Sequence, residues 1–126
     1  IVDQRVCGAR RLAREPDLDV VPMPVRHPVY FFARADHPLT RSTATIRAAD
    51  VMAWPFATPS RIPPRVLDPM LAAHREGSSR LPSARPFPAI SCSGLAPVKR
   101  IVAASDVVSA SILPCIAEDL DSGRFK

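Results

Sequence analysis

The chain has 126 residues, a length that suits one compact domain. Its residues are 47% hydrophobic and 23% charged, which is ordinary globular usage and excludes extensive disorder, and no apolar run approaches the roughly 20 residues of a membrane span. Lysine and arginine exceed the acidic residues by 17 to 12, but they are scattered without interleaved aromatic residues. We therefore interpret the net charge of +5 as a solvated basic surface and not as a nucleic-acid site.

The amino-terminal part of the chain predicts short elements separated by prolines. Ile1–Arg5 has the pattern of the end of a strand, Arg10–Glu15 that of a helical turn, and Leu18–Val21 that of a second strand. Val29–Ala33 is an aromatic run that predicts a strand, and His37–Ser42 follows it as a turn. Because the sequence opens without an initiator Met or a signal-peptide pattern, we interpret it as a fragment of a longer, soluble protein.

From Thr45 onward, predicted helices and strands alternate along the chain. The helices are expected at about Arg47–Ala53, capped by Thr45; from Pro64 or Arg65 to His74, ended by Gly77; and at Leu95–Ala104. The strands are expected at Trp54–Thr58, Phe87–Cys92 and Val107–Leu113, and Pro114–Asp121 is expected to form a short amphipathic turn. This alternation is typical of the α/β class, so we expect helices packed on a mixed sheet.

Two of the predicted loops lead from the carboxyl end of a strand into the beginning of a helix. Thr58, Pro59 and Ser60 form the first loop, and Ser93 and Gly94 belong to the second. Such loops present free backbone N–H groups and the positive end of a helix dipole, which together suit a carboxylate or another anion. The hydroxyl groups can add hydrogen bonds to a ligand, although capping of the following helix is the commonest role of Ser and Thr at such positions.

The histidines and cysteines predict neither a catalytic constellation nor a metal site. The histidines lie in three different predicted segments, without an acidic or cysteine neighbour at ligand spacing: His27, His37 and His74. We interpret His37 as part of a turn. The cysteines are widely separated, as is typical of reduced cytosolic thiols: Cys7, Cys92 and Cys115. Cys92 adjoins the second loop and is either a small buried hydrophobic residue or a thiol sensor.

Three stretches of the chain share a pattern with one protein family. The first is Arg34–Leu39, which closes the aromatic strand; the second is Val98–Asp106, followed by Ile112–Pro114; the third is Asp119–Phe125. In composition, order and spacing they resemble the effector-binding domain of LysR-type bacterial transcriptional regulators. Ser105 and Asp106 stand where the family more usually has glycines, a departure that leaves the conformation of that turn open.

The resemblance implies a type 2 periplasmic-binding-protein-like fold, in which the chain crosses twice between two α/β lobes and a small molecule sits in the cleft. The chain would be a partial effector-binding domain. Residues 1–36 would end the first lobe and form a crossover, residues 37–113 would form the second lobe, and residues 114–126 would return toward the first. In this family the loop that holds Thr58 and Ser60 supplies effector contacts, which strengthens their assignment more than that of Ser93.

The implied function is effector sensing without enzymatic activity: binding of a small, anionic metabolite modulates DNA binding and transcription. The implied partners are that effector, further copies of the chain in a dimer or tetramer, and DNA bound through a helix-turn-helix domain that is not part of this sequence. No cofactor, metal or membrane contact is expected, and the expected location is the cytoplasm. A periplasmic solute-binding protein of the same fold is the alternative. A helix-turn-helix preceding this segment would indicate the regulator, and a signal peptide would indicate the solute-binding protein.

Overall fold

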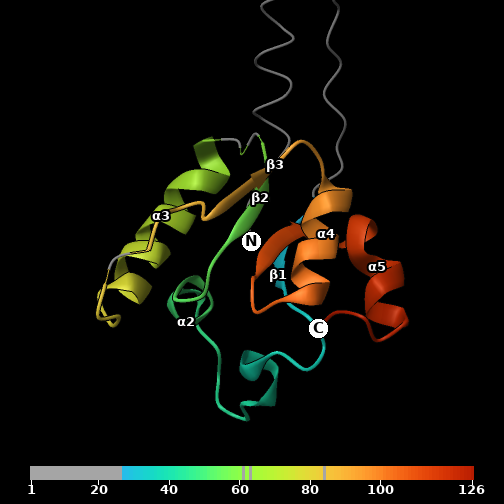
Figure 1. Cartoon of the computed structure of the whole chain (residues 1–126), viewed down its shortest axis with the longest axis horizontal. Coiled ribbons are helices and arrows are strands. Elements are labelled where there is room, and N and C mark those ends of the chain that lie inside the picture. The colour runs from blue at the N-terminus through green and yellow to red at the C-terminus, as the bar shows by residue number, and fades with distance from the viewer. Residues whose placement is uncertain (1–26, 61, 63, 84) are drawn as a thin grey trace, which may run out of the picture.

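A computed structural model describes residues 27–60, 62, 64–83 and 85–126 (Figure 1). Three predicted elements, Ile1–Arg5, Arg10–Glu15 and Leu18–Val21, lie outside the described residues, as does Cys7. The described elements, in chain order, are β1 (Val29–Phe32), the 3-10 helix η1 (Pro38–Arg41), α2 (Ala48–Met52), β2 (Ala57–Pro59), α3 (Pro64–Ser78), β3 (Ile90–Cys92), α4 (Leu95–Ala104), β4 (Ser109–Ile112) and α5 (Leu113–Asp121). Within the described part of the chain, no helix is both long and apolar enough to cross a membrane.

The strands form two pairs that a single bridge joins into a small mixed arrangement. β1 pairs antiparallel with β4, and β2 pairs parallel with β3. A parallel bridge between Phe56 and Val108 connects the pairs, and the N–H of Ala57 donates to the Val108 carbonyl at 3.0 Å. The strand order is therefore β1–β4–β2–β3, with β1 running against the others. The expected α/β class, with helices packed on a mixed sheet, is confirmed.

Apolar side chains bury both faces of the strands. One core cluster lies toward α4 and α5 and consists of Phe32, Ala57, Val98, Val102, Val107, Ile116 and Phe125. The other lies toward α2 and α3 and consists of Ala33, Val51, Met52, Phe56, Val66, Met70 and Val108. Figure 1 shows the two helix pairs on opposite sides of the strands. Each of the larger buried side chains contributes about 1.5–3 kcal/mol of transfer free energy, so the two clusters are the main source of stability.

Helix α2 begins later than expected and is capped by a different residue. Thr45 was predicted to cap it, but Arg47 occupies the N-cap position, where its backbone N–H donates to the Asp50 carboxylate at 2.9 Å. A carboxylate three residues into the helix satisfies one donor at the helix start, which is the usual role of an N3 acid. Ile46, between the predicted and the observed cap, precedes the first turn and is 43% exposed. The cap predicted at Thr45 was therefore wrong.

Helix α3 extends past the glycine that was expected to end it. It was predicted to stop near His74, yet it continues through the buried Gly77 to Ser78. A Cβ atom built at Gly77 would lie 2.4 Å from the carbonyl oxygen of Ala49 and 2.9 Å from the nitrogen of Ala53. The glycine thus permits the close approach of α2 and α3, and this packing, not helix termination, explains its position.

Smaller differences affect the strand boundaries and the last element. β2 begins at Ala57 instead of Trp54, and β3 begins at Ile90 instead of Phe87. Prolines just before both strands lack the N–H that a ladder needs, which accounts for the late starts. The expected turn at Pro114–Asp121 is the nine-residue helix α5, with its proline in the first turn, where a missing N–H costs nothing.

Candidate functional site

The two strand-to-helix loops predicted to bind a ligand lie next to each other in the structure. β2 and β3 are parallel neighbours, with Thr58 opposite Ser91 and Pro59 opposite Cys92. Their carboxyl ends therefore meet at one edge, near the top of Figure 1. We call this edge, with Thr58, Pro59, Ser60, Ser93 and Gly94, the β2–β3 edge.

A cavity of about 230 Å³ opens beside the first loop of the β2–β3 edge. Thr58 and Pro59 line it, whereas Ser60, Ser93 and Gly94 do not. Its remaining walls are mostly apolar and come from β1, α3, β4 and the start of α5: Val29, Phe56, Ile62, Val66, Met70, Ala110, Ser111, Ile112 and Cys115. The Thr58 side chain is almost fully buried, and its hydroxyl donates to the Pro59 carbonyl at 2.9 Å. That hydroxyl oxygen retains lone pairs that can accept a hydrogen bond from a ligand.

The second loop leaves the start of α4 without a side-chain cap. Gly94 is the N-cap residue, with an extended backbone (φ −168°, ψ 178°), and a Cβ built on it would meet no atom within 4 Å. Ser93, one residue earlier, is exposed and is not the cap. The first N–H groups of α4 consequently lack a capping side chain at residue 94 and retain their capacity to bind an anion.

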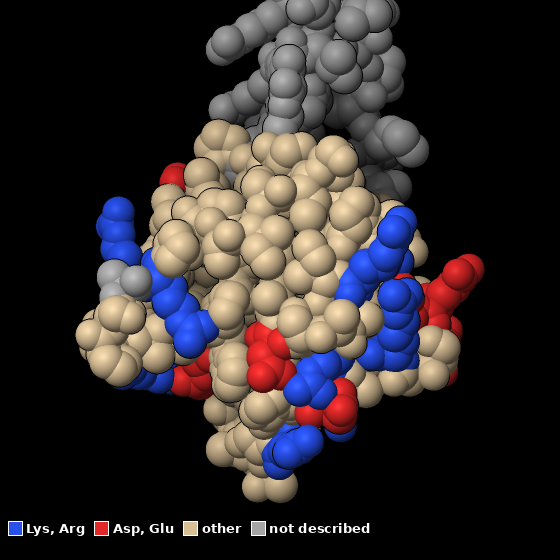
Figure 2. Space-filling view, in the orientation of Figure 1, with Lys and Arg blue, Asp and Glu red and all other residues tan. Residues whose placement is uncertain are grey.

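Capping, the alternative role for these hydroxyls, is not what the structure describes for Thr58 or Ser93. Thr58 donates to a neighbouring carbonyl, and Gly94 occupies the cap position beside Ser93. Ser60 is exposed at the end of β2, next to residues outside the described ranges. Figure 2 shows charged side chains gathered mainly on the lower half of this face, while the region above them is largely uncharged. Backbone N–H groups at the start of α4 are one source of positive potential at the β2–β3 edge.

The two described cysteines differ in their surroundings. Cys92 is partly buried and packs against the core cluster on the α4 side, as expected of a small hydrophobic residue. Cys115 is exposed and lines the cavity beside Thr58. Neither forms a disulfide among the described residues.

A larger cavity, of about 480 Å³, lies away from the predicted site residues. It is bounded by β1, η1 and the stretch before α2, and Phe31, Leu39, Ile46 and Lys126 are among its lining residues. None of the five residues of the β2–β3 edge contributes to it. The predicted site thus corresponds to the smaller of these two cavities.

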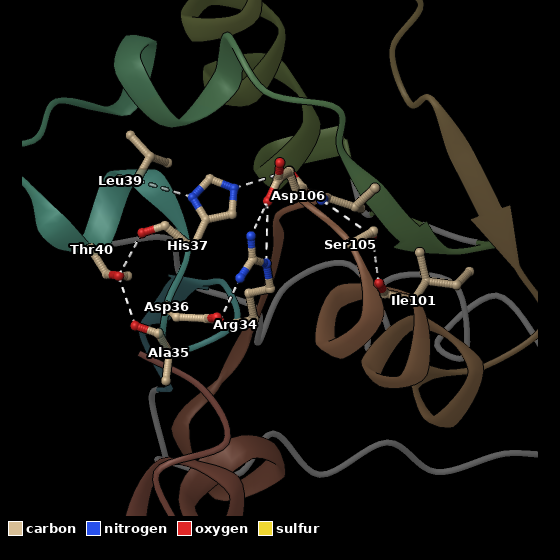
Figure 3. A network of polar contacts seen from close by, with 10 residues as sticks. Arg34, Ala35, Asp36, His37, Leu39, Thr40, Ile101, Ser105 and Asp106 are labelled. Atoms are coloured by element: carbon tan, nitrogen blue, oxygen red, sulfur yellow. Dashed lines mark hydrogen bonds and ion pairs between the residues drawn. The ribbon is translucent and has the colours of Figure 1, made fainter.

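A dense polar network lies at the opposite end of α4 (Figure 3). The Arg34 guanidinium contacts Asp106 Oδ1 through Nε at 3.2 Å and Nη2 at 2.5 Å, and its Nη1 contacts Asp36. The hydrogen bond to Asp106 is the main cause that raises the pKa of Arg34, and the bond from Arg34 lowers the pKa of Asp36. We call Arg34, Asp36, His37 and Asp106 the clamp.

His37 is the fully buried member of the clamp. Its Nδ1 accepts a hydrogen bond from the Leu39 N–H at 3.1 Å, and its Nε2 lies 3.0 Å from the Asp106 carbonyl oxygen. A carbonyl only accepts and an amide N–H only donates, so both bonds form when the ring is neutral and carries its proton on Nε2. The ring also meets Trp54 edge to face, with centroids 4.6 Å apart. The prediction that His37 belongs to a turn is confirmed, since it caps η1.

Local sequence patterns did not predict the bond from His37 to Asp106 or the ion pair from Arg34. Both join residues about 70 positions apart, beyond the reach of periodicity or local spacing. Arg34 and His37 lie in one family-like stretch, Arg34–Leu39, and Asp106 lies in another, Val98–Asp106. Their membership in these stretches was the sequence signal that could have pointed to the contacts. Asp106, at the turn whose conformation the sequence left open, pairs with Arg34 in the structure.

The third family-like stretch contacts the other two. Ala35 N–H donates to the Arg124 carbonyl at 3.1 Å, which places the chain end alongside the segment after β1. Asp119 on α5 contacts Lys99 Nζ on α4 at 2.6 Å and Arg124 Nη1 at 3.0 Å. The bond from Lys99 is the main cause that lowers the pKa of Asp119, against the opposing effect of burial. All three stretches therefore form one connected region of the structure.

The other titratable residues do not assemble into a metal site. His74 lies 3.0 Å from the Arg85 carbonyl and stacks against Phe87 at 5.2 Å. Over residues 27–60, 62, 64–83 and 85–126, no group of three or more His, Cys, Asp or Glu side chains could hold a metal ion.

Comparison with known proteins relates the chain to transcriptional regulation. No family model matches the chain. It is 32% identical over 121 residues to the SDS degradation transcriptional activation protein of Pseudomonas sp. (strain ATCC 19151). The match covers 95% of this chain but 36% of that protein, so the chain spans about a third of the length of its relative. This similarity supports the interpretation of the chain as part of a transcriptional regulator.

Proposed function

We propose that the chain is part of the effector-sensing domain of a LysR-type transcriptional regulator and has no catalytic role. The transcriptional-activator relative favours a regulator over a periplasmic solute-binding protein. The observation that carries the ligand assignment is the parallel pairing of β2 and β3, which brings both strand-to-helix loops to one edge beside an apolar cavity. In the whole protein this edge would face the cleft between two lobes. Residues 37–113 would form the second lobe, flanked by the crossovers.

The chemistry of the β2–β3 edge suits a small anion with an apolar body. The N–H groups at the start of α4 and the hydroxyls of Ser60 and Ser93 can donate hydrogen bonds to the anionic group, and the Thr58 hydroxyl can do so by turning away from the Pro59 carbonyl. Apolar walls such as Phe56 and Met70 can take the rest of the ligand. The relative is named for SDS degradation, so alkyl sulfates are the first ligand class to test.

Regulation would follow from differential binding to two lobe arrangements. A ligand that bridges the cleft binds one arrangement more tightly and shifts a pre-existing equilibrium toward it. The DNA-binding domain, outside this sequence, would read out that shift in a cytoplasmic dimer or tetramer.

The direct test changes Thr58 and Ser60 to alanine in the full-length protein. Octyl sulfate, used below its micelle concentration, is titrated calorimetrically into the unaltered protein and the double variant. Each lost hydrogen bond to a charged ligand costs about 1.5–3 kcal/mol, so affinity should fall about tenfold or more. The variant Thr43→Ala with Thr45→Ala, which removes exposed hydroxyls from the segment before α2, is the matched control and should bind normally.

One result would contradict the site assignment, and a DNA-binding measurement without ligand checks that the fold is intact. Unchanged octyl sulfate affinity in the double variant would remove Thr58 and Ser60 from the site. If the double variant also loses DNA affinity in the absence of ligand, by as much as it loses octyl sulfate affinity, the changes have damaged the fold. If the unaltered protein binds no octyl sulfate, alkyl sulfates are excluded as the ligand class.

A further inference from the structure

Helix α4 connects the β2–β3 edge to the clamp. Its amino-terminal end follows Gly94, and its carboxyl end leads through Ser105 into Asp106. Ten residues span about 15 Å, so the two sites are joined by a short rigid element. The side chains of Val98 and Val102 are fully buried, which seats the middle of the helix in the core.

The turn that ends α4 is held by side-chain bonds. The Ser105 hydroxyl donates to the Ile101 carbonyl at 2.6 Å, and it accepts from the Val107 N–H at 3.4 Å (Figure 3). These bonds fix Asp106 relative to the last turn of α4. A displacement of Asp106 is therefore accompanied by a displacement of the last turn of α4.

Two contacts of different kinds reach Asp106 from the segment after β1. The bond from His37 to the Asp106 carbonyl comes from a fully buried ring, so breaking it would leave a buried ring nitrogen without a partner. The ion pair with Arg34 is partly solvated, since the side chains of Arg34 and Asp106 are 24% and 48% exposed. Solvated ion pairs contribute little net free energy and can break and re-form. The clamp thus combines a hydrogen bond from a buried histidine, which holds the turn in place, with an ion pair that can break and re-form.

We infer that Arg34, acting through Asp106, is a positioning residue that couples the β2–β3 edge to β1. Residues 1–36 would contain the crossover to the first lobe, so a shift of α4 on ligand binding would reach that crossover through the Arg34–Asp106 pair. This inference rests on the proposed function. It adds to that function a residue that transmits the response without touching the ligand.

The test uses full-length variants with a chemically matched control. Arg34→Gln removes the charge that contacts Asp36 and Asp106. Asp106→Asn removes the partner charge but retains the backbone carbonyl that His37 uses. Arg80→Gln is the control, because Arg80 also contacts two carboxylates, Asp50 and Glu76, in a solvated pair between α2 and α3.

The first readout needs no ligand. Cys92 packs against the cluster that holds α4, so its rate of reaction with a thiol reagent reports motion of that helix. In a background in which every other cysteine of the full-length protein is changed to serine, Cys7 and Cys115 included, Arg34→Gln and Asp106→Asn should raise this rate roughly threefold to tenfold, whereas Arg80→Gln should leave it unchanged. Equal rates in all variants, or an equal increase in the control, would overturn the inference.

The second readout separates coupling from binding. Octyl sulfate affinity is measured by calorimetry, and the affinity for a DNA fragment that the protein binds is measured with and without octyl sulfate. Arg34→Gln should keep octyl sulfate affinity within about twofold but reduce the ligand-induced change in DNA affinity roughly fivefold, with partial recovery in Arg34→Lys. A normal ligand-induced change in Arg34→Gln would overturn the inference. If octyl sulfate binds none of the proteins, the proposed ligand class fails, and the Cys92 rates still decide the coupling.

Discussion

The clamp and the β2–β3 edge both contain polar groups, but the two regions use them differently. In the clamp, Arg34 contacts two carboxylates and His37 uses both ring nitrogens within the fold. At the β2–β3 edge, the Thr58 hydroxyl bonds to the adjacent carbonyl, and Gly94 leaves the start of α4 without a side-chain cap. Polar groups whose capacity is used internally stabilise a fold, whereas groups with unused capacity can bind a ligand. Changes in the clamp should therefore reduce stability, and changes at the edge should reduce ligand affinity.

The largest loss of stability is expected from a steric change outside both regions. Gly77→Ala would place a methyl group 2.4 Å from the Ala49 carbonyl oxygen, and backbone atoms cannot rotate away as a side chain can. We expect a loss of about 3 kcal/mol or more in the free energy of unfolding, measured by urea denaturation. Alanine in a helix is otherwise favoured over glycine by about 1 kcal/mol. A stabilised variant would therefore contradict the close packing of α2 and α3.

The next largest effect is expected in the clamp. His37→Ala leaves the part-buried Leu39 N–H and Asp106 carbonyl without their partner, empties the space of a fully buried ring and removes the contact with Trp54. The free energy of unfolding should fall by about 2–3 kcal/mol. His74→Ala is the comparison, because His74 is partly exposed, whereas His37 is fully buried, and it also lies within hydrogen-bond distance of a carbonyl, that of Arg85. If His74→Ala lowers the free energy of unfolding as much as His37→Ala does, the distinct structural role of His37 is refuted.

An intermediate, pH-dependent effect is expected at Asp119. Lys99 and Arg124 lower its pKa below the ordinary value of 3.8 in the folded protein. A carboxyl with a lowered folded pKa contributes stability above its unfolded pKa, and this contribution is lost as the pH falls through the folded value. Asp119→Asn should therefore cost about 1 kcal/mol at pH 7 and progressively less below about pH 4. Thermal unfolding from pH 7 to pH 3 measures this, and a loss that stays constant with pH would contradict it.

The smallest effect on stability is expected at the β2–β3 edge. Gly94→Ala adds a methyl group that meets no atom within 4 Å, on an extended backbone that any residue adopts. The free energy of unfolding should change by less than about 0.5 kcal/mol. Octyl sulfate affinity should fall nonetheless, because the methyl group hinders approach to the first N–H groups of α4. A large loss of stability would show that this edge is structural and would break the contrast with the clamp.

The sequence alone determined the α/β class and the position of α4. Its apolar spacing and flanking Gly94 predicted Leu95–Ala104, the range that the structure has. Both features are local, because helix periodicity and caps depend on residues within a few positions of each other. The loops of the β2–β3 edge were identified for the same reason, as a strand followed directly by a helix. Their role in ligand binding stays a prediction.

Only the tertiary structure decided how these elements meet. The passage of α3 through Gly77 depends on the approach of α2, which overrides the usual tendency of glycine to end a helix. The ion pair from Arg34 to Asp106 spans 72 positions, and the pairing of β2 with β3 spans more than 30. Such contacts depend on how the whole chain folds and not on the spacing of neighbouring residues, since many arrangements satisfy the same local pattern.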